Sequence, residues 1–245
     1  ILVAARRGAV VREVPFEALA DSIRPGTRLV AFSLTQMQTG KTADLASIVE
    51  RAATVGADVF VDGTQSIPFV SIGEFLPRIA YLVCAGYKHL LSPRGTAYFY
   101  VRPDRWDHLE AHNANWRAAD QPFNRYFGGP LHLSATAARF DVSRAWFPWL
   151  GASESLRLLA SWRDSDLFAG VRRLADRLAG ATGMPRPGSS LVCVPIADAE
   201  RARLALKAAG VKASVRGTSI RFSPHVYNTE ADIDAAIDAI SPHIE

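Results

Sequence analysis

VFVDGTQ at residues 59–65 and YLVCAGYKHLL at residues 81–91 decide the fold of this chain. Both are short, continuous apolar runs rich in Val, Phe, Leu and Tyr, which is typical of strands that are buried on both faces of a sheet. The first run ends at Asp62, and Lys88 stands just after the second. In an open α/β sheet, groups beyond the carboxyl ends of neighbouring strands face one crevice, so we expect Asp62 and Lys88 to converge on a single site.

The residues before these runs predict a strand, a helix and a connection to the next strand. RLVAFS at residues 28–33 predicts a strand. TADLASIVERAATVG at residues 42–56 places apolar residues at helical spacing, with Thr42 expected to cap its start and Gly56 to end it. A connection of this kind is right-handed and joins parallel strands.

The later connections are shorter. Residues 66–78 contain Pro68 and Pro77, so a short helical or irregular crossover is expected there. Residues 96–101 predict a further strand, antiparallel to its predecessor because the connection is short. Residues 102–121 show no regular period and predict a long loop.

The carboxyl-terminal part predicts two amphipathic helices, at residues 145–162 and 164–180, followed by a compact remainder. That remainder reads strand, helix, strand, strand, helix, and Thr229 with Asp232 has the spacing of a capping box before the last helix. The whole pattern predicts an α/β fold with a mostly parallel sheet flanked by helices in residues 1–154, and a small α+β domain in residues 155–245.

Composition excludes several classes of protein. The chain has 245 residues, 49% of them hydrophobic, and a formal net charge of +4 without a basic, aromatic-rich block, so we expect no nucleic-acid partner. Two Cys, at positions 84 and 193, offer neither a disulfide framework nor metal-ligand spacing, and we expect no metal site. No apolar run approaches the roughly 18 residues of a membrane span, so a cytoplasmic protein without membrane contact is expected.

The chain begins ILVAARRGAVV, without an initiator Met, as though already inside a domain. We therefore expect the large domain to be incomplete at its amino end.

A carboxylate and an amine at one edge of a sheet suit pyridoxal 5'-phosphate (PLP). This cofactor needs a Lys for a Schiff base and an acidic partner that keeps its pyridine nitrogen protonated. Lys88 and Asp62 are the candidates for these two roles. Taken singly, each has an ordinary explanation, because Asp-Gly is a common turn and a Lys after a strand is usually solvated. The combination favours the cofactor.

Four motifs occur in the order of a known family. DGTQS at residues 62–66, AGYKHLLSPRGTAYFYV at 85–101, ARFDVS at 138–143 and IRFSPHVYNTEADID at 220–234 resemble the class V aminotransferase family. The resemblance implies the fold-type I architecture of PLP enzymes, a PLP cofactor, an amino acid substrate and a homodimer. The family includes cysteine desulfurases, kynureninases and isopenicillin N epimerase-like proteins.

The resemblance also implies roles for individual residues. Gln65 would donate a hydrogen bond to the ring hydroxyl of the cofactor, and Tyr87, as in the kynureninase branch, would contact its phosphate. Arg221 would clamp the α-carboxylate of the substrate, with Arg216 as the alternative. In related enzymes an earlier segment supplies a helix amino terminus that grips the phosphate. No residue of this sequence can be assigned to that role.

The reaction stays open at this stage. An aminotransferase or epimerase-like activity is the leading prediction, and a kynureninase-like hydrolysis is the alternative because of Tyr87. A desulfurase is disfavoured, because residues 212–225, where a nucleophilic Cys is expected, contain none. A non-catalytic remnant of the fold is the remaining hypothesis, motivated by the incomplete amino end.

Overall fold

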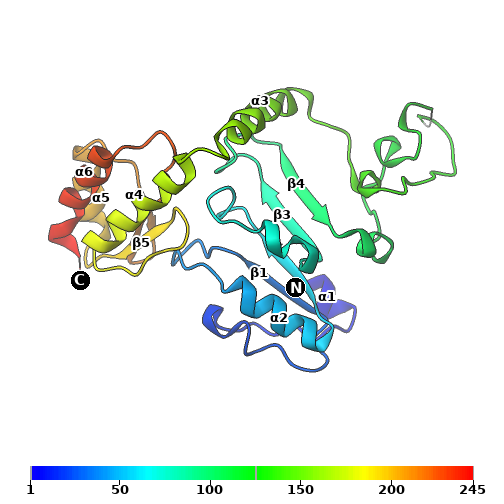
Figure 1. The fold of residues 1–245 in the computed structure, drawn as a ribbon, viewed down its shortest axis with the longest axis horizontal. Helices are drawn as coiled ribbons and strands as arrows, with labels where there is room; N and C mark the ends of the chain where they lie inside the picture. Colours follow the sequence, from blue (N-terminus) through cyan, green and yellow to red (C-terminus); the bar gives the residue numbers. More distant parts are fainter. Residues whose placement is uncertain (1, 125, 245) are drawn as a thin grey trace.

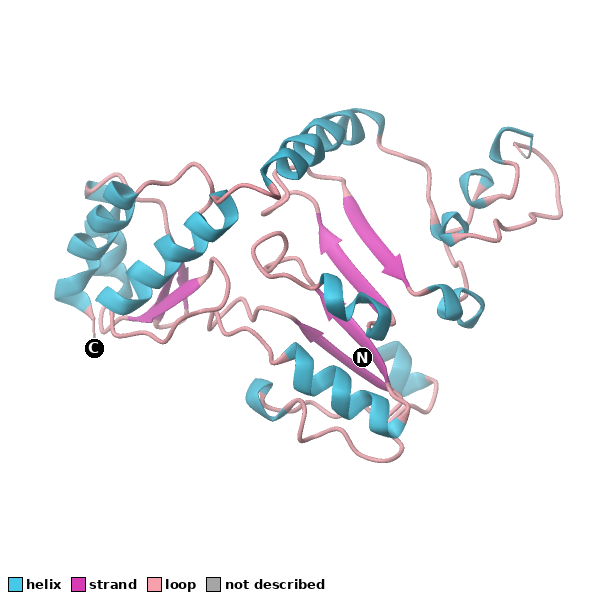
Figure 2. Ribbon diagram, viewed as in Figure 1, coloured by secondary structure: helices cyan, strands magenta, loops and turns pink. Residues whose placement is uncertain are grey.

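The computed structural model describes residues 2–124 and 126–244. Within them, the larger sheet has the order β1-β2-β3-β4 and consists of β1 (Leu29–Ser33), β2 (Asp58–Asp62), β3 (Tyr81–Ala85) and β4 (Ala97–Val101). The pairs β1–β2 and β2–β3 are parallel, and β3–β4 is antiparallel (Figures 1 and 2). The predicted mostly parallel α/β sheet is therefore confirmed, including the antiparallel last strand.

Helix α2 (Leu45–Val55) connects β1 to β2 and covers the sheet with its apolar face. Gly56 ends it in the left-handed conformation, as predicted, with φ of 68°. The predicted cap was wrong: Asp44, not Thr42, accepts a hydrogen bond from the Ser47 amide at 3.1 Å. Thr42 instead donates its hydroxyl to the carbonyl of Pro187 at 2.8 Å, so a long-range contact has taken the side chain that local sequence assigns to capping.

Short 3-10 turns occupy the connections. η2 (Gly73–Arg78), which contains Pro77, forms the crossover from β2 to β3. The stretch between β4 and the next long helix extends away from the sheet in Figure 1, and its described residues form short turns. These are η3 (Pro103–His108), η4 (Trp116–Ala118), η5 (Pro122–Asn124) and η6 (Ala137–Phe140), while α1 (Leu2–Arg6) and η1 (Phe16–Ala18) precede β1.

The carboxyl-terminal sheet has the order β5-β7-β6, with both pairs antiparallel. Its apolar face packs against three helices, and the capping box of Thr229 and Asp232 is confirmed. The elements are α4 (Leu167–Ala181), β5 (Val192–Pro195), α5 (Ala199–Ala208), β6 (Ser214–Arg216), β7 (Ser219–Phe222), α6 (Glu230–Ile240) and η7 (Ser241–His243).

The two sheets have separate cores, one formed between Leu19 and Leu82 and the other between Leu174 and Ile244. Helix α3 (Trp146–Trp162) lies between them in the chain, and its Leu159 packs with Cys84 of the larger sheet. The division into residues 1–154 and 155–245 remains a proposal, and it passes within α3. Among the described residues, no helix is both long and apolar enough to cross a membrane.

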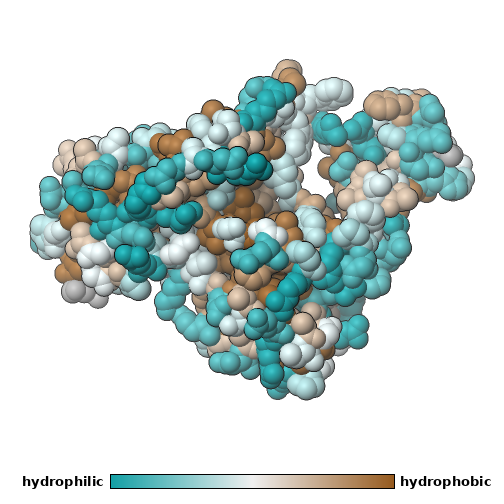
Figure 3. All heavy atoms as spheres, viewed as in Figure 1, coloured by the Kyte–Doolittle hydropathy of each residue, from teal (hydrophilic) through white to brown (hydrophobic). Residues whose placement is uncertain are grey.

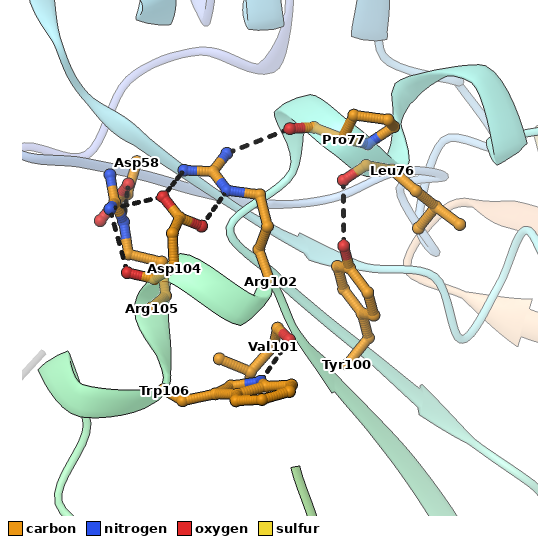
Figure 4. A network of polar contacts seen from close by, with 9 residues as sticks. All are labelled: Asp58, Leu76, Pro77, Tyr100, Val101, Arg102, Asp104, Arg105 and Trp106. Atoms are coloured by element: carbon orange, nitrogen blue, oxygen red, sulfur yellow. Dashed lines mark hydrogen bonds and ion pairs between the residues drawn. The ribbon is translucent and has the colours of Figure 1, made fainter. Parts of the chain in front are cut away.

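A polar network fixes the amino end of β2, the end opposite Asp62 (Figure 4). Arg105 of η3 donates to Asp58 at 2.8 Å, and both side chains are about three-quarters buried. Arg105 also pairs with Asp104, which binds Arg102 in turn. The network ties β2 to the chain that leaves β4, so it holds the sheet from the end remote from the candidate site.

Asp58→Ala is expected to lower the free energy of unfolding by about 1–2 kcal/mol, because it breaks a mostly buried ion pair. Asp164→Ala is the matched control, since Asp164 forms a fully exposed pair with Arg163 and its loss is expected to change stability far less. Urea unfolding of both variants measures the difference. Equal costs would show that the network does not stabilise the sheet.

Candidate active site

The carboxyl ends of β2 and β3 bring the two principal candidates to one edge of the sheet. Asp62 ends β2 beside Val83 of β3, and Lys88 follows the end of β3 at Ala85. Thr64 joins the two strand exits, because its amide donates to Asp62 Oδ1 at 2.9 Å and its hydroxyl accepts from the Ala85 amide at 3.0 Å. The loop after β2 is thus held against the loop after β3.

The pKa of Cys84 depends on the charges of both Asp62 and Lys88. The pKa of the Cys84 thiol is raised to about 11, chiefly by burial and also by the negative charge of Asp62, while the positive charge of Lys88 acts in the opposite direction. Both charges act on the same buried thiol, so Asp62 and Lys88 lie in one neighbourhood. Their predicted convergence thereby has a geometric and an electrostatic basis.

A tight turn positions Lys88. The Ser92 amide donates to the Gly86 carbonyl at 2.9 Å, and the Leu91 amide donates to the Lys88 carbonyl at 3.0 Å. A Cβ atom on Gly86 would overlap the Thr96 hydroxyl, so this position requires glycine. Leu91 has φ of 53°, an uncommon conformation for a residue with a side chain and one that gathers at functional sites. Within the described residues, the half-buried Lys88 amine has no hydrogen bond or ion pair.

Tyr87 lies beside two cations. Its side chain is 41% exposed, the guanidinium of Arg94 lies 4.5 Å from its ring centroid, and Lys88 Nζ lies 6.0 Å from it. Neither cation pairs with a carboxylate among the described residues. This surface therefore suits an anionic group such as a phosphate.

Gln65 is 9% exposed and follows Asp62 and Thr64 in the same loop. Its side-chain amide has no hydrogen-bond partner within the described residues. The loop itself is anchored, since the Ser66 hydroxyl donates to Thr35 Oγ1 at 2.8 Å. An amide in this position, without a partner among the described residues, is available to a polar group of a ligand.

Arg221 reaches the same edge from the small sheet. Its Nη1 donates to the carbonyl of Met37, in the loop after β1, at 3.3 Å, while its Nε is buried with no partner among the described residues. Figure 1 shows this loop extending from β1 toward β5. Burial lowers the pKa of Arg221, and the charge of Arg216 lowers it further. A guanidinium held in this way has donors available for an anion.

The sequence reasoning missed a contact between two histidines. His225 accepts from the Val226 amide at its Nδ1, so its Nε2 carries the proton and donates to the His89 carbonyl at 3.0 Å. Both rings pack on the edge of Phe69, with centroid distances of 5.2 and 5.1 Å. His89 directly follows Lys88 and His225 lies near Arg221, so this contact connects the two halves of the candidate site. In the sequence, this contact was indicated only by the positions of the two His, each of which lies near a predicted site residue.

Burial predicts a specific pH dependence of stability. It lowers the pKa of His89 to about 4, with the charges of His225, Lys88 and Arg221 acting in the same direction, and it also lowers the pKa of His225. The unfolded state, in which His titrates near 6.5, binds the proton first, so stability falls as pH drops from about 6.5 to about 4. For His89 alone the expected loss is up to about 3 kcal/mol over this range.

The free energy of unfolding of the wild type and of His89→Phe, measured between pH 7 and 4, tests this dependence. Phe keeps a ring against Phe69 but cannot titrate, so its profile is expected to be flatter. His112→Phe, at an exposed position, should keep the wild-type slope. An unchanged slope in His89→Phe would show that His89 does not bind the proton on unfolding.

Three cavities lie around these residues. One of about 580 Å³ separates α4 from residues 225–230, and one of about 850 Å³ separates residues 38–44 from residues 184–193. A third, of about 300 Å³, is apolar and includes Cys84 and Leu156 of α3 in its wall. Figure 3 shows apolar side chains gathered in the hollow below α3 in that view. Neither Asp62 nor Lys88 lines any of these three cavities. The candidate site is therefore located by the strand ends and the loops that follow them.

The donor set fits PLP. As far as the described residues show, it comprises an amine without a hydrogen bond or ion pair, a carboxylate whose Oδ1 accepts one amide hydrogen bond, the amide of Gln65 and a guanidinium without a carboxylate partner. These are the groups that a cationic pyridine, a ring hydroxyl and an amino acid carboxylate require. Within the described residues, no group of three or more His, Cys, Asp or Glu could hold a metal ion.

Comparisons with known proteins identify the family and the fold of this chain. A family model described as Aminotransferase class-V matches residues 5–161. Isopenicillin N epimerase of Streptomyces clavuligerus is 27% identical, covering 91% of this chain and 62% of its own length. Cysteine desulfurase IscS of Shewanella baltica (strain OS155) is 24% identical, covering 95% of this chain and 61% of its own length.

The fold has counterparts among solved structures. A C-DES mutant with glycine covalently linked to its PLP cofactor superposes with a TM-score of 0.81 at 18% identity, covering 99% of this chain and 70% of that one. At this identity the likeness shows the fold. The chain spans about three fifths of the length of the two curated relatives.

Proposed function

This chain belongs to the class-V aminotransferase family, and we propose that it forms part of a PLP-dependent enzyme that acts on an amino acid. Its α/β architecture is the fold-type I architecture of the PLP enzyme that it resembles. One observation carries the proposal: Asp62 and Lys88 stand at the ends of adjacent parallel strands, and both charges act on the thiol of Cys84.

The residues at the strand ends would hold the cofactor. PLP, when bound, joins an amine as a Schiff base and draws electrons from a substrate carbanion into its ring. Lys88 supplies the amine at Nζ. Asp62 would face the pyridine nitrogen and keep it protonated, Gln65 would donate its amide to the ring hydroxyl, and Tyr87 would contact the phosphate.

Two residues act on the substrate. Arg221 offers its guanidinium to the α-carboxylate, whose two oxygens match the planar fork. Lys88 Nζ takes the α-proton and returns it, as a general base and then a general acid. The His89–His225 contact holds the loop of Lys88 and the strand of Arg221 in one arrangement, so that proton transfer and carboxylate binding occur at one place.

Transamination or epimerisation is the reaction we propose first. The similarity to an isopenicillin N epimerase favours this class, in which the α-proton leaves and returns or an amino group is transferred. Kynureninase-like hydrolysis is the second candidate, on the ground of Tyr87. A non-catalytic remnant of the fold is a third, and it would keep the site residues without turnover.

We also propose a cytoplasmic homodimer. Several large apolar side chains of the segment between β4 and α3, and of α3 itself, face solvent in the single chain, which is typical of a surface covered by a partner. These are Phe123, Tyr126, Phe127, Trp146, Phe147 and Leu150. Sedimentation of the chain at increasing concentration tests the dimer.

Visible absorbance of the purified chain with added PLP tests the proposed function. A band that borohydride removes, with the label recovered on Lys88, would support it. Turnover of a panel of amino acids, followed by keto acid release, loss of optical rotation and release of anthranilate from kynurenine, then separates the three reactions. A band without turnover would favour the remnant, and the lack of any band would contradict cofactor binding by this chain.

A further inference from the structure

The polar face of the small sheet carries two arginines side by side. In antiparallel register Arg221 of β7 stands opposite Ser214 of β6, and Arg216 of β6 stands opposite Ser219 of β7. Because side chains alternate along a strand and opposite residues share a face, Arg216 and Arg221 project from the same face. The other face carries Val194 and Ile220 of the small core.

Neither arginine forms an ion pair within the described residues. The Nη1 of Arg216 donates to the Val215 carbonyl at 2.8 Å, as that of Arg221 does to Met37. The Nε of each is buried, with no partner in the part of the chain that the structure describes. The charge of Arg216 lowers the pKa of Arg221, so the two cations repel each other without an anion between them. Among the described residues, nine arginines do pair with Asp or Glu: Arg102, Arg105, Arg139, Arg157, Arg163, Arg173, Arg177, Arg201 and Arg203.

Two partly buried guanidiniums with free donors form a receptor for two negative charges. A single carboxylate satisfies one guanidinium fork and leaves the second cation uncompensated. A ligand with two carboxylates neutralises both and relieves their repulsion. The present partners of the two arginines are backbone carbonyls, which carry no net charge and therefore cannot neutralise either cation.

We propose that Arg216 and Arg221 together select a substrate with two anionic groups, namely an amino acid whose side chain ends in a second carboxylate. Arg221 binds the α-carboxylate and Arg216 binds the side-chain carboxylate. This inference rests on the proposed function for the identity of the ligand as an amino acid. Arg216 is then a specificity-determining residue, and its loss affects the choice of substrate more than the chemistry.

Isothermal titration calorimetry with succinate, glutarate and butyrate tests the proposal, on the chain with and without PLP. We expect at least one dicarboxylate to bind about tenfold or more tightly than butyrate. Arg216→Gln is expected to remove that preference and to leave butyrate binding unchanged. Arg216→Lys keeps the charge without the fork and should retain part of the preference. Arg203→Gln, which removes an arginine on α5, is the matched control and should behave as the wild type.

Equal affinity of the wild type for succinate, glutarate and butyrate would overturn the proposal. This comparison needs only the wild type, so it does not depend on whether a variant folds. A uniform loss of all three ligands in Arg216→Gln would also overturn it, because both arginines would then serve one carboxylate. A dicarboxylate preference without a PLP absorbance band would contradict the proposed function, while the binding of two carboxylates by Arg216 and Arg221 would still hold. A PLP band without the preference would contradict this inference alone.

Discussion

Lys88→Ala is expected to abolish covalent PLP binding and to reduce turnover by about a thousandfold or more, because it removes both the amine that holds the cofactor and the group that moves the α-proton. Lys41, which lies in the loop after β1, is engaged in an ion pair with Glu17. Absorbance with PLP, borohydride labelling and turnover of the best amino acid measure the loss.

The same variant is expected to leave stability nearly unchanged, within about 0.5 kcal/mol, since the Lys88 amine has no hydrogen bond or ion pair in the described structure. Lys207→Ala, at an exposed position of α5, is the matched control and should retain both absorbance and turnover. A Lys88→Ala variant that kept the absorbance band would place the Schiff base on another amine. A large loss of stability would instead make Lys88 a structural residue.

The parallel sheet was predictable because its central strands are marked by strong local patterns. The continuous apolar runs at residues 59–65 and 81–91 became β2 and β3, and the short connection before residue 97 fixed β4 as antiparallel. The cap of α2 was not predictable in the same way. Thr42 binds the carbonyl of Pro187, a residue 145 positions away, and no local pattern reports such a partner.

The site shows the same limit. Asp62 and Lys88 could be placed together because each follows a strand, and neighbouring parallel strands end at one edge. The contact of His89 with His225 spans 136 positions and depends on how the small sheet meets the larger one. Arg216 was noted only as a substitute for Arg221, because a missing ion-pair partner becomes visible only when every neighbouring carboxylate has been located.

Asp62→Asn is expected to separate cofactor binding from catalysis. Asn has nearly the same shape, and its Oδ1 can still accept from the Thr64 amide, so the loop should survive and Lys88 should still bind PLP. A neutral amide cannot hold a proton on the pyridine nitrogen, and the ring then stabilises a carbanion poorly. We expect turnover to fall by about a hundredfold or more while the absorbance band persists.

The charge of Asp62 offers a second readout that is independent of turnover. Its carboxylate contributes to the raised pKa of Cys84, so Asp62→Asn should lower that pKa from about 11. The ultraviolet absorbance of the thiolate during a pH titration measures it in a Cys193→Ser background, because the pKa of Cys193 is also raised to about 11. Asp238→Asn, at an exposed position of α6, should change neither quantity. If the Cys84 pKa falls and turnover does not, then Asp62 lies where the structure places it but does not act on the cofactor. If neither changes, the carboxylate does not reach this edge of the sheet, and the assignment of the active site to the ends of β2 and β3 fails with it.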